Sequence, residues 1–317
     1  MTGIITPPRA IAIGTFDGVH IGHQQILQQL GDVAAKRHLE RMVYSFVVPP
    51  RFALGKEPKR LLFPEWVKVM VLKKYVEEVN RVAFEDIYSI SAKEFVDDVL
   101  IGGLSAQAIV VGEGFRFGND REGDAGLLRE LGDARRVDVI VVPRVLMDGE
   151  VVSSSRIRWL IAEGKMKQAH KLLGRPPLIV GRVIYGDKLG QALGYPTANL
   201  EIDEGILIPG NGIYLVNVFW RKRKSAGLLY VGKRPSVDGR EHRLEVHLFS
   251  SIVGSRASME ISEHLYGETL EVQILKKMRD EKNFPTRAEL SRQMGLDVQR
   301  ARELVSDFKW PEKSILT

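Results

Sequence analysis

Over the first 145 residues, short runs of β-branched and apolar residues alternate with segments of helical periodicity. The runs that predict strands are AIAI (10–13), MVYSFV (42–47), RVAF (81–84), AIVVG (108–112) and VDVIVVP (137–143). Between them, apolar residues recur at the spacing of an amphipathic helix, and two of these segments open with a proline or a serine. Strands that alternate with helices pair in parallel, because each helix carries the chain back across the sheet. We therefore predict a parallel sheet covered by helices.

The pattern changes after GRPPL (174–178), where the prolines cannot continue a helix. We predict a domain boundary there, between residues 1–174 and 178–317. Short alternating segments with glycine turns follow, and they predict a small antiparallel barrel. These segments are LIVGRVIYG, GIYLVNVFW, LLYVGKR, RLEVHLFSS and TLEVQILKKM. The last long segment, TRAELSRQMGLDVQRARELVSDF, predicts a C-terminal helix.

Composition excludes several kinds of chemistry. The chain has no cysteine, which excludes disulfides, thiolate zinc sites, iron–sulfur clusters and a cysteine nucleophile. It has no run of roughly 20 apolar residues and no signal-peptide pattern at its start, so we expect a cytoplasmic protein. The net charge of +6 suits either nucleic acid or a nucleoside triphosphate. The basic runs RKRK (221–224) and KKMRDEK (276–282) are interpreted as solvated surface, the first at an exposed hairpin tip.

The stretch GTFDGVHIGH (14–23) directly follows the first predicted strand and contains two histidines, His20 and His23. In a parallel sheet, ligands bind where strands end and helices begin, because unpaired N–H groups and the helix dipole favour phosphate there. The glycines allow a tight backbone, and both imidazoles can then face one phosphate. Capping or packing of the helix start is the structural alternative. A metal site lacks a third ligand nearby.

Two further segments carry suitable polar groups. In VVSSSRIR (151–158), the serines can cap a helix N-terminus, and Arg158 adds a forked cation that suits phosphate. In LGYPTANL (193–200), Thr197 and Asn199 are two apart on an extended segment, so both face the same side and suit a hard cation. Taken alone, the first pattern is usually a structural helix cap, and the second is also compatible with a plain turn.

Together, these segments resemble a known family. GTFDGVHIGH is similar to the H-x-G-H signature of nucleotidyltransferases, and its longer form resembles the bacterial bifunctional riboflavin kinase/FAD synthetase family. The resemblance implies a Rossmann-like nucleotidyltransferase domain whose catalytic histidines, His20 and His23, bind ATP phosphates. It places five more residues at the adenylylation site: Gly14, Phe16, Asp17, Gly18 and Gly22.

Two other segments of the first half resemble family motifs. VGEGFRFG (111–118) is similar to V-G-x-D-F-x-F-G, which implies that Phe115 and Phe117 help to hold the flavin. VVSSSRIR resembles I-S-S-T-x-x-R, which implies triphosphate contacts from Ser153, Ser154, Ser155 and Arg158. For Phe115 and Phe117, packing under a surface loop is the alternative.

In the second half, LGYPTANL matches the P-T-A-N signature of riboflavin kinases, whose fold is a small β-barrel. The resemblance implies that Thr197 and Asn199 hold Mg²⁺ and that four glycines let a loop wrap the nucleotide: Gly181, Gly186, Gly190 and Gly194. LEVHLF (244–249) resembles E-x-H-L-x-D-F, which implies that Glu245 is the catalytic base. RDEKNF (279–284) matches R-x-E-x-x-F and places Arg279, Glu281 and Phe284 near the isoalloxazine. VGKRPSV (231–237) and HLYG (264–267) resemble supporting motifs.

The chain departs from the family pattern at Gly114, Leu189, Gln191 and Ser250, and SFVVPP (45–50) lacks a family histidine. The resemblance implies a bifunctional enzyme with ATP as co-substrate, Mg²⁺ as cofactor, and riboflavin, FMN and FAD as substrates and products. We expect no nucleic-acid and no membrane partner. One alternative is a protein with FMN adenylyltransferase activity only. Another is a flavin-sensing or nucleic-acid-binding regulator, although no helix-turn-helix or aromatic-basic RNA pattern is present.

Overall fold

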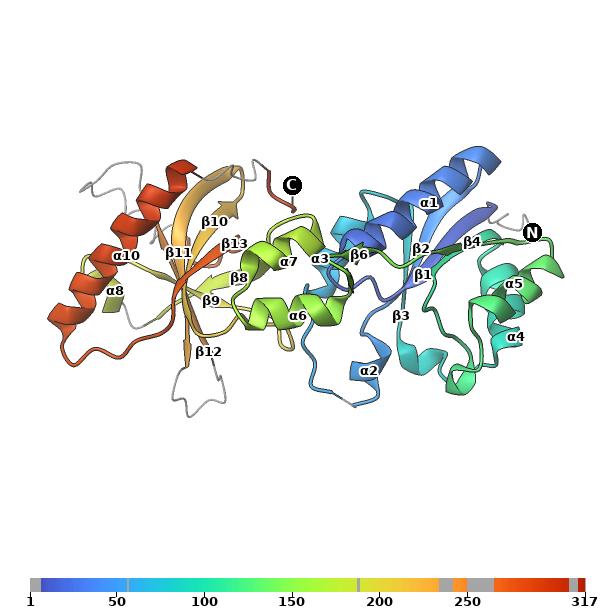
Figure 1. Cartoon of the computed structure of the whole chain (residues 1–317), viewed down its shortest axis with the longest axis horizontal. Coiled ribbons are helices and arrows are strands. Elements are labelled where there is room, and N and C mark those ends of the chain that lie inside the picture. Colours follow the sequence, from blue (N-terminus) through green and yellow to red (C-terminus); the bar gives the residue numbers. More distant parts are fainter. Residues whose placement is uncertain are drawn as a thin grey trace. The chain divides into compact units, whose positions relative to one another are not determined.

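A computed structural model describes residues 7–55, 57–186, 189–233, 242–249, 265–307 and 313–316 of the chain. The chain forms two compact units, residues 1–154 and 155–317, and each is described by itself. The first unit contains a five-stranded sheet in the order β3-β2-β1-β4-β5 with every pair parallel. Figure 1 labels β1 to β4 of this sheet. Its strands are β1 (Arg9–Gly14), β2 (Glu40–Phe46), β3 (Glu78–Val82), β4 (Ala106–Gly112) and β5 (Asp138–Val142). The predicted parallel sheet is confirmed.

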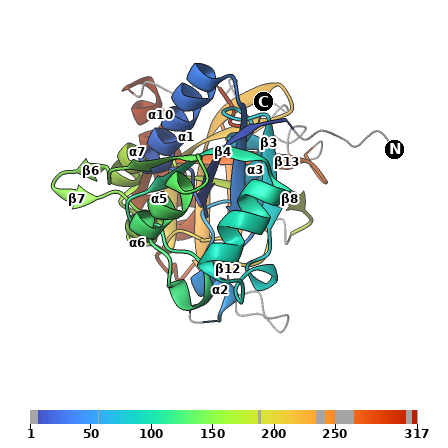
Figure 2. The same cartoon turned by 90° about the vertical axis from the view of Figure 1, so that its right-hand side faces the viewer.

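Helices and short turns connect these strands. They are α1 (Ile21–Arg37), α2 (Pro50–Ala53), α3 (Glu65–Leu72), η1 (Phe84–Asp86), α4 (Ala92–Glu94), the π-helical η2 (Phe95–Gly103), η3 (Asn119–Arg121) and α5 (Ala125–Asp133). A two-stranded ribbon that the sequence did not predict, β6 (Leu146–Met147) with β7 (Glu150–Val151), follows the sheet (Figure 2). Pro64 and Ser91 stand at the starts of α3 and α4, as the sequence predicted.

Both faces of the sheet are buried, because side chains alternate along the central strands and helices cover each side. Ile11 and Ile13 of β1 belong to a core cluster with Phe95 and Leu100 of η2 and Leu128 of α5. The intervening residues of β1 point to the other side because side chains alternate along a strand. That side is covered by α1, which contacts both β1 and β4.

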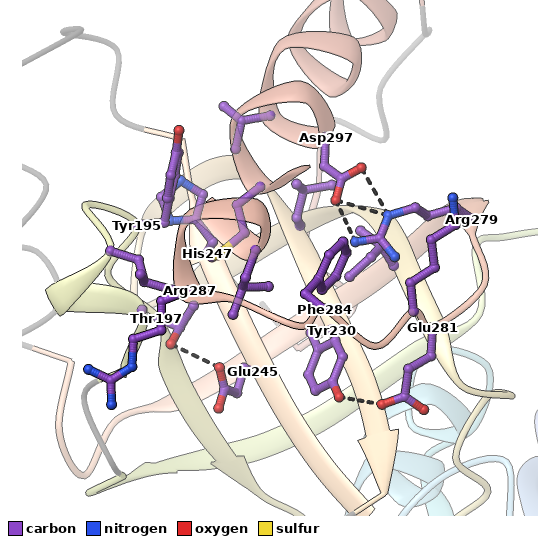
Figure 3. A pocket seen from close by; sticks show the side chains of 18 of the residues that line it. Tyr195, Thr197, Tyr230, Glu245, His247, Arg279, Glu281, Phe284, Arg287 and Asp297 are labelled. Atoms are coloured by element: carbon purple, nitrogen blue, oxygen red, sulfur yellow. Dashed lines mark hydrogen bonds and ion pairs between the residues drawn. The ribbon is translucent and has the colours of Figure 1, made fainter. Parts of the chain in front are cut away.

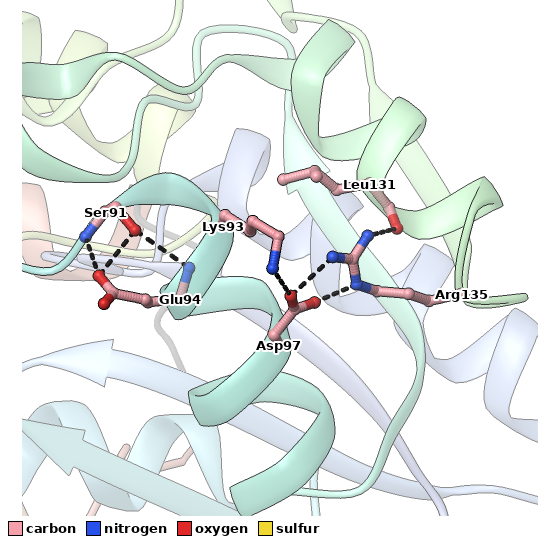
Figure 4. Close-up of polar contacts among 6 residues, drawn as sticks. All are labelled: Ser91, Lys93, Glu94, Asp97, Leu131 and Arg135. Carbon is pink, nitrogen blue, oxygen red and sulfur yellow. Dashed lines mark hydrogen bonds and ion pairs between the residues drawn. The ribbon is translucent and has the colours of Figure 1, made fainter.

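A polar network ties η2 to the end of α5 (Figure 4). Asp97 of η2 accepts hydrogen bonds from the Arg135 guanidinium and, at 2.9 Å, from Lys93. The Arg135 hydrogen bond is the main reason that the pKa of Asp97 falls to about 2. One turn earlier, Ser91 and Glu94 form a reciprocal capping box that fixes where this helical segment begins.

The second unit contains helices and a closed barrel of six strands in the order β10-β11-β12-β9-β8-β13, with neighbours antiparallel. The strands are β8 (Leu178–Ile184), β9 (Ala198–Glu201), β10 (Gly212–Trp220), β11 (Arg223–Lys233), β12 (His242–Leu248) and β13 (Thr269–Arg279). The helices are α6 (Ser154–Ala162), α7 (Met166–Leu173), α8 (Leu189–Ala192) and α10 (Arg287–Asp307). The predicted barrel and C-terminal helix are confirmed. The structure also places a tight turn at Arg221, where the hairpin tip was expected.

The outer face of the barrel carries α10. Leu215 of β10 and Leu228 of β11 share an apolar cluster with Ala301 of α10. The alternate residues of β10, such as Val216 and Val218, are also fully buried, and because side chains alternate along a strand they face the barrel interior.

Segment 174–178 connects α7 to the barrel. Gly174 ends α7 in left-handed backbone with φ 72°, and β8 begins at Leu178. The division between the compact units falls earlier, after Ser154, and α7 contacts β13. The boundary at 174–178 therefore stays a prediction about where the two functions divide.

Candidate active sites

The first candidate site is the histidine turn, which we define as residues 14–23 between the end of β1 and the first turn of α1. His20 is the N-cap of α1, and its Nδ1 accepts a hydrogen bond from the backbone N–H of His23 at 3.3 Å. Phe16 and Val19 have positive φ angles of 47° and 38°. Non-glycine residues rarely adopt this conformation, and such strain concentrates at functional sites.

The two histidines lie against each other. Their rings stack with centroids 3.6 Å apart and planes 17° from parallel. A side chain at Gly22 would place its Cβ 3.2 Å from the His20 ring, so the glycine makes room for this arrangement. Phe16, fully buried, supports the His23 ring from 5.2 Å. The sequence therefore brings both imidazoles together within a single turn, and the expectation that they grip phosphate stays a prediction.

Distant segments anchor the histidine turn through Asp17. The buried Asp17 carboxylate accepts a hydrogen bond from the backbone N–H of Leu62 at 3.0 Å. The Ser154 hydroxyl donates to the Asp17 carbonyl at 2.9 Å. Ser153 precedes it in the same unit, whereas Ser155 and the buried Arg158 lie in the part of α6 that belongs to the second unit. The triphosphate roles predicted for these four residues stay predictions.

The predicted flavin loop follows β4. The Phe115 and Phe117 rings stack with centroids 5.4 Å apart, but Phe117 belongs to the buried core whereas Phe115 packs at its edge. Packing therefore accounts for Phe117, and its predicted flavin contact stays untested. At Gly114, the Arg144 guanidinium lies 3.2 Å from where a Cβ would be, so a larger residue there would contact this cation.

The second candidate site is built by strand register in the barrel. Five residues occupy paired positions on five neighbouring strands, which gives them one common face. They are Arg279 of β13, Ile213 of β10, Tyr230 of β11, Glu245 of β12 and Asn199 of β9. We call this row the belt.

At one end of the belt, the Thr197 hydroxyl donates a hydrogen bond to Glu245 Oε2 at 3.1 Å (Figure 3). Glu245 is buried and also forms an ion pair with Arg243 on the same strand. Thr197 lies two residues before Asn199, as a shared face requires. The motif threonine, the motif asparagine and the predicted base are thus together in the folded barrel.

The glycines predicted to wrap a nucleotide surround this end of the belt. A Cβ on Gly186 would collide with the Asn199 amide, and one on Gly190 would collide with the Tyr195 carbonyl. A Cβ on Gly181 would lie 2.9 Å from the Glu201 carbonyl oxygen, and Gly194 has a φ of 85°. The first three allow close backbone approach and the fourth a left-handed turn. Their contact with a nucleotide stays a prediction.

A cavity of about 400 Å³ lies beside the belt and beneath α10. Six of the residues predicted from sequence line it: Gly190, Thr197, Glu245, Arg279, Glu281 and Phe284. Its apolar wall includes Ile213 and Leu228 of the barrel with Leu290 and Met294 of α10. An apolar slot with polar groups at both ends fits a flat aromatic ligand that carries polar substituents and a hydroxylated chain.

Two polar contacts hold the far end of the cavity (Figure 3). Arg279 donates to both oxygens of the Asp297 carboxylate on α10, at 2.7 to 3.0 Å. Glu281 accepts hydrogen bonds from the Tyr230 hydroxyl and, at 2.8 Å, from the Asn211 amide. Burial, then the Glu281 hydrogen bond, raises the pKa of Tyr230. Arg279 and Glu281 therefore brace the cavity as well as line it.

Sequence patterns did not identify several lining residues. Tyr230 and Asp297 were missed because their partners are distant in sequence. His247 also lines the cavity, and its Nδ1 lies 2.9 Å from the Pro196 carbonyl within the P-T-A-N segment. Desolvation lowers the pKa of His247 and favours its neutral form. The available signal was the quoted LEVHLF motif, in which His247 follows Glu245 by two and so shares its face.

Some departures and supporting motifs lie outside the described residues. Ser250, the long interval after it, His264 of HLYG and residues 234–237 of VGKRPSV are among these. Gln191 lies in α8, which begins at Leu189.

Comparison with known proteins covers both units. Residues 5–156 match the family described as FAD synthetase, and residues 173–305 match riboflavin kinase. The chain is 36% identical over 299 residues to the bifunctional riboflavin kinase/FMN adenylyltransferase of Buchnera aphidicola subsp. Schizaphis graminum, covering 92% of each chain. It is 35% identical over 297 residues to the protein of the same name from Escherichia coli K12, covering 92% of this chain and 91% of that one.

A solved structure from Streptococcus pneumoniae, titled as a macrolide-efflux protein, is similar with a TM-score of 0.82 and 32% identity, covering 98% of this chain and 97% of that one. Among the described residues of the present chain, no helix has the length and apolar character needed to cross a bilayer.

The relatives match nearly the whole chain, and both family matches agree with the two units. The chain therefore belongs to the bifunctional riboflavin kinase/FMN adenylyltransferase family.

Proposed function

We propose that the protein makes FAD in two steps. The barrel unit transfers the γ-phosphoryl group of ATP to riboflavin, giving FMN and ADP. The first unit joins FMN to the adenylyl group of a second ATP, giving FAD and pyrophosphate. The observation that carries this proposal is that one chain matches both families, with Thr197 beside Glu245 in the barrel and His20 stacked on His23 in the first unit as supporting geometry.

In the kinase step, the terminal ribityl hydroxyl attacks the γ-phosphorus and must lose its proton. Glu245 is the proposed acceptor because its buried carboxylate lines the cavity beside Thr197. A placed base contributes about 10²- to 10⁴-fold to such a reaction. The apolar wall and Phe284 hold the ring system, which directs the ribityl chain towards Glu245.

The donor set at this end of the belt fits Mg²⁺. Thr197 and Asn199 offer neutral oxygens next to the Glu245 carboxylate, and hard cations bind such oxygens while sharing substrate phosphates. When bound there, the ion neutralises charge on the ATP phosphates. Thr197 and Asn199 would hold it, and Glu245 would keep its proton-accepting role.

In the adenylylation step, the FMN phosphate is itself the nucleophile and attacks the α-phosphorus of ATP. The protein's part is to position the two phosphates and to offset developing charge. His20 and His23 are the proposed donors, placed at the N-terminus of α1 where its dipole also favours an anion. Ser153, Ser154, Ser155 and Arg158 are the proposed triphosphate contacts, and Phe115 a flavin contact.

Separate assays of the two half-reactions test the proposal. Riboflavin with ATP and Mg²⁺ is expected to give FMN and then FAD, and FMN with ATP is expected to give FAD and pyrophosphate. FAD from FMN without FMN from riboflavin would remove the kinase function and leave an adenylyltransferase. Salt-sensitive binding to random DNA with no ATP turnover would instead favour a regulator.

We further propose a cytoplasmic location for the protein and a division between its two activities at segment 174–178.

A further inference from the structure

Lys68 is a buried lysine that neither the sequence motifs nor the proposed chemistry uses. It lies on α3, and its side chain is 4% exposed. Its Nζ donates to the Phe46 carbonyl at 2.6 Å and pairs with Glu65 Oε2 at 2.9 Å. It also lies 3.5 Å from the carbonyls of Thr15 and Val47.

An ammonium group in this position carries an energetic cost unless its donors are satisfied. The three N–H donors of Lys68 meet that requirement among three main-chain carbonyls and one carboxylate, of which Phe46 and Glu65 are the nearest. Two of the carbonyls belong to the end of β2 and the residue after it, and the third follows the end of β1. Lys68 therefore links the carboxyl ends of β1 and β2 to α3. In parallel sheets, ligands bind at the carboxyl ends of the strands.

The contact with Thr15 reaches the histidine turn. Thr15 directly precedes Phe16, whose φ is positive and whose ring supports His23. The same stretch of chain supplies a second anchor, because Leu62 donates its N–H to Asp17. The residues from 62 to 68 thus hold the turn at two points, one by main chain and one by Lys68.

We propose that Lys68 is a positioning residue for adenylyl transfer. It fixes the carbonyl of Thr15 and thereby the strained start of the histidine turn, so that His20 and His23 keep their places relative to the reacting phosphate. This inference rests on the proposed function of the first unit. Displacement of catalytic groups by about 1 Å can lower a rate by as much as about 10²-fold, so the effect of losing this tie should be measurable.

The test compares Lys68→Met with Lys73→Met in the full chain. Methionine keeps an unbranched apolar stem and removes the ammonium. Lys73, at the C-terminal end of the same helix, donates to the exposed Glu77 carbonyl, so its substitution removes the same charge away from the turn. We expect Lys68→Met to lower kcat of FAD formation from FMN by about 10- to 100-fold with less than a twofold change in KM for FMN. Lys73→Met should stay within twofold of wild type.

Riboflavin phosphorylation by the same preparations is the internal reference and should be unchanged in both variants. A wild-type chain that forms no FAD would count against the proposed function and not against the role of Lys68. Assays are run well below the unfolding midpoint of each variant, and Lys68→Gln, which retains a shorter donor, provides the same measurement if methionine prevents folding.

Two results would overturn the proposal. The first is a kcat for FAD formation within twofold of wild type in a folded Lys68→Met or Lys68→Gln chain. The second is a loss of activity that matches the unfolded fraction at each temperature, because this describes a residue that only stabilises the fold. A fall in kcat that persists at temperatures where the variant is fully folded supports positioning.

Discussion

The two candidate sites are assembled in opposite ways. The histidine turn places its imidazoles within ten consecutive residues, and contacts from Leu62, Lys68 and Ser154 only hold it in position. The belt has no such local unit, because its residues come from five different strands and meet through pairing register. A site built from one short segment is sensitive to changes in the backbone of that segment. A site built by strand register depends instead on how distant strands pair.

The largest effect is expected at Glu245, the proposed catalytic base in the belt. Glu245→Gln keeps the shape of the side chain and removes its ability to accept a proton, so FMN formation should fall about 10²- to 10⁴-fold. FAD formation from added FMN should not change. Glu268→Gln is a matched control, since that carboxylate pairs with Arg221 outside the cavity. An unaltered riboflavin kinase rate in Glu245→Gln would refute its role as base.

A smaller loss is expected at the histidine turn. His23→Ala removes one donor from the proposed phosphate site, and loss of one such donor typically costs about 10²- to 10³-fold in kcat. The variant should accumulate FMN from riboflavin while FAD formation is slowed. His38→Asn at the other end of α1 is the control, because asparagine tolerates the left-handed φ of 56° found there. Equal effects at both ends of the helix would argue against a site at its start.

The packing of the belt can be disturbed without touching its chemistry. A Cβ at Gly232 would collide with the Tyr230 hydroxyl and approach Glu281 to 2.7 Å. Gly232→Ala should destabilise the protein by about 1–3 kcal/mol and raise KM for riboflavin, because Tyr230 and Glu281 line the cavity. Thermal unfolding and kinase assays measure both effects. Gly31→Ala, with open space around it on α1, should instead be neutral or stabilising.

The smallest effect concerns the ion pair of Asp97 and Arg135. Because the folded pKa of Asp97 is about 2 against a usual 3.8, the folded state gains stability from its ionised form above about pH 4. This contribution decreases as the pH falls towards 2 and is absent below it. The difference in free energy of unfolding between wild type and Asp97→Asn should follow that course. Asp98→Asn, at an exposed neighbour, removes the same charge and controls for the change in net charge.

The same contrast explains what the sequence could predict. Strands, the helix starts at Pro64 and Ser91, and the histidine turn depend on local patterns, and the fold was predicted correctly from them. The π-helical form of Phe95–Gly103 was not predicted, since helical periodicity indicates a helix but not its hydrogen-bond pattern.

The missed residues depend on contacts between distant segments. Tyr230 and Asp297 become partners of Glu281 and Arg279 only when register and the docking of α10 are known. Lys68 was missed because a lysine in a helix indicates an exposed residue unless the surrounding carbonyls are seen. For Phe117, the sequence motif suggested a functional role, but the side chain lies in the buried core. A family motif alone cannot distinguish a flavin contact from a core side chain.

The central claim is that the chain carries two separate catalytic sites linked by FMN, and a mixing experiment tests it most directly. Glu245→Gln should lack the kinase and His23→Ala should lack efficient adenylylation, so neither alone should convert riboflavin to FAD at the wild-type rate. An equimolar mixture with ATP and Mg²⁺ should restore FAD formation, because FMN released by His23→Ala is used by Glu245→Gln. A mixture that forms no more FAD than the sum of the separate variants, although it accumulates FMN, would contradict the account.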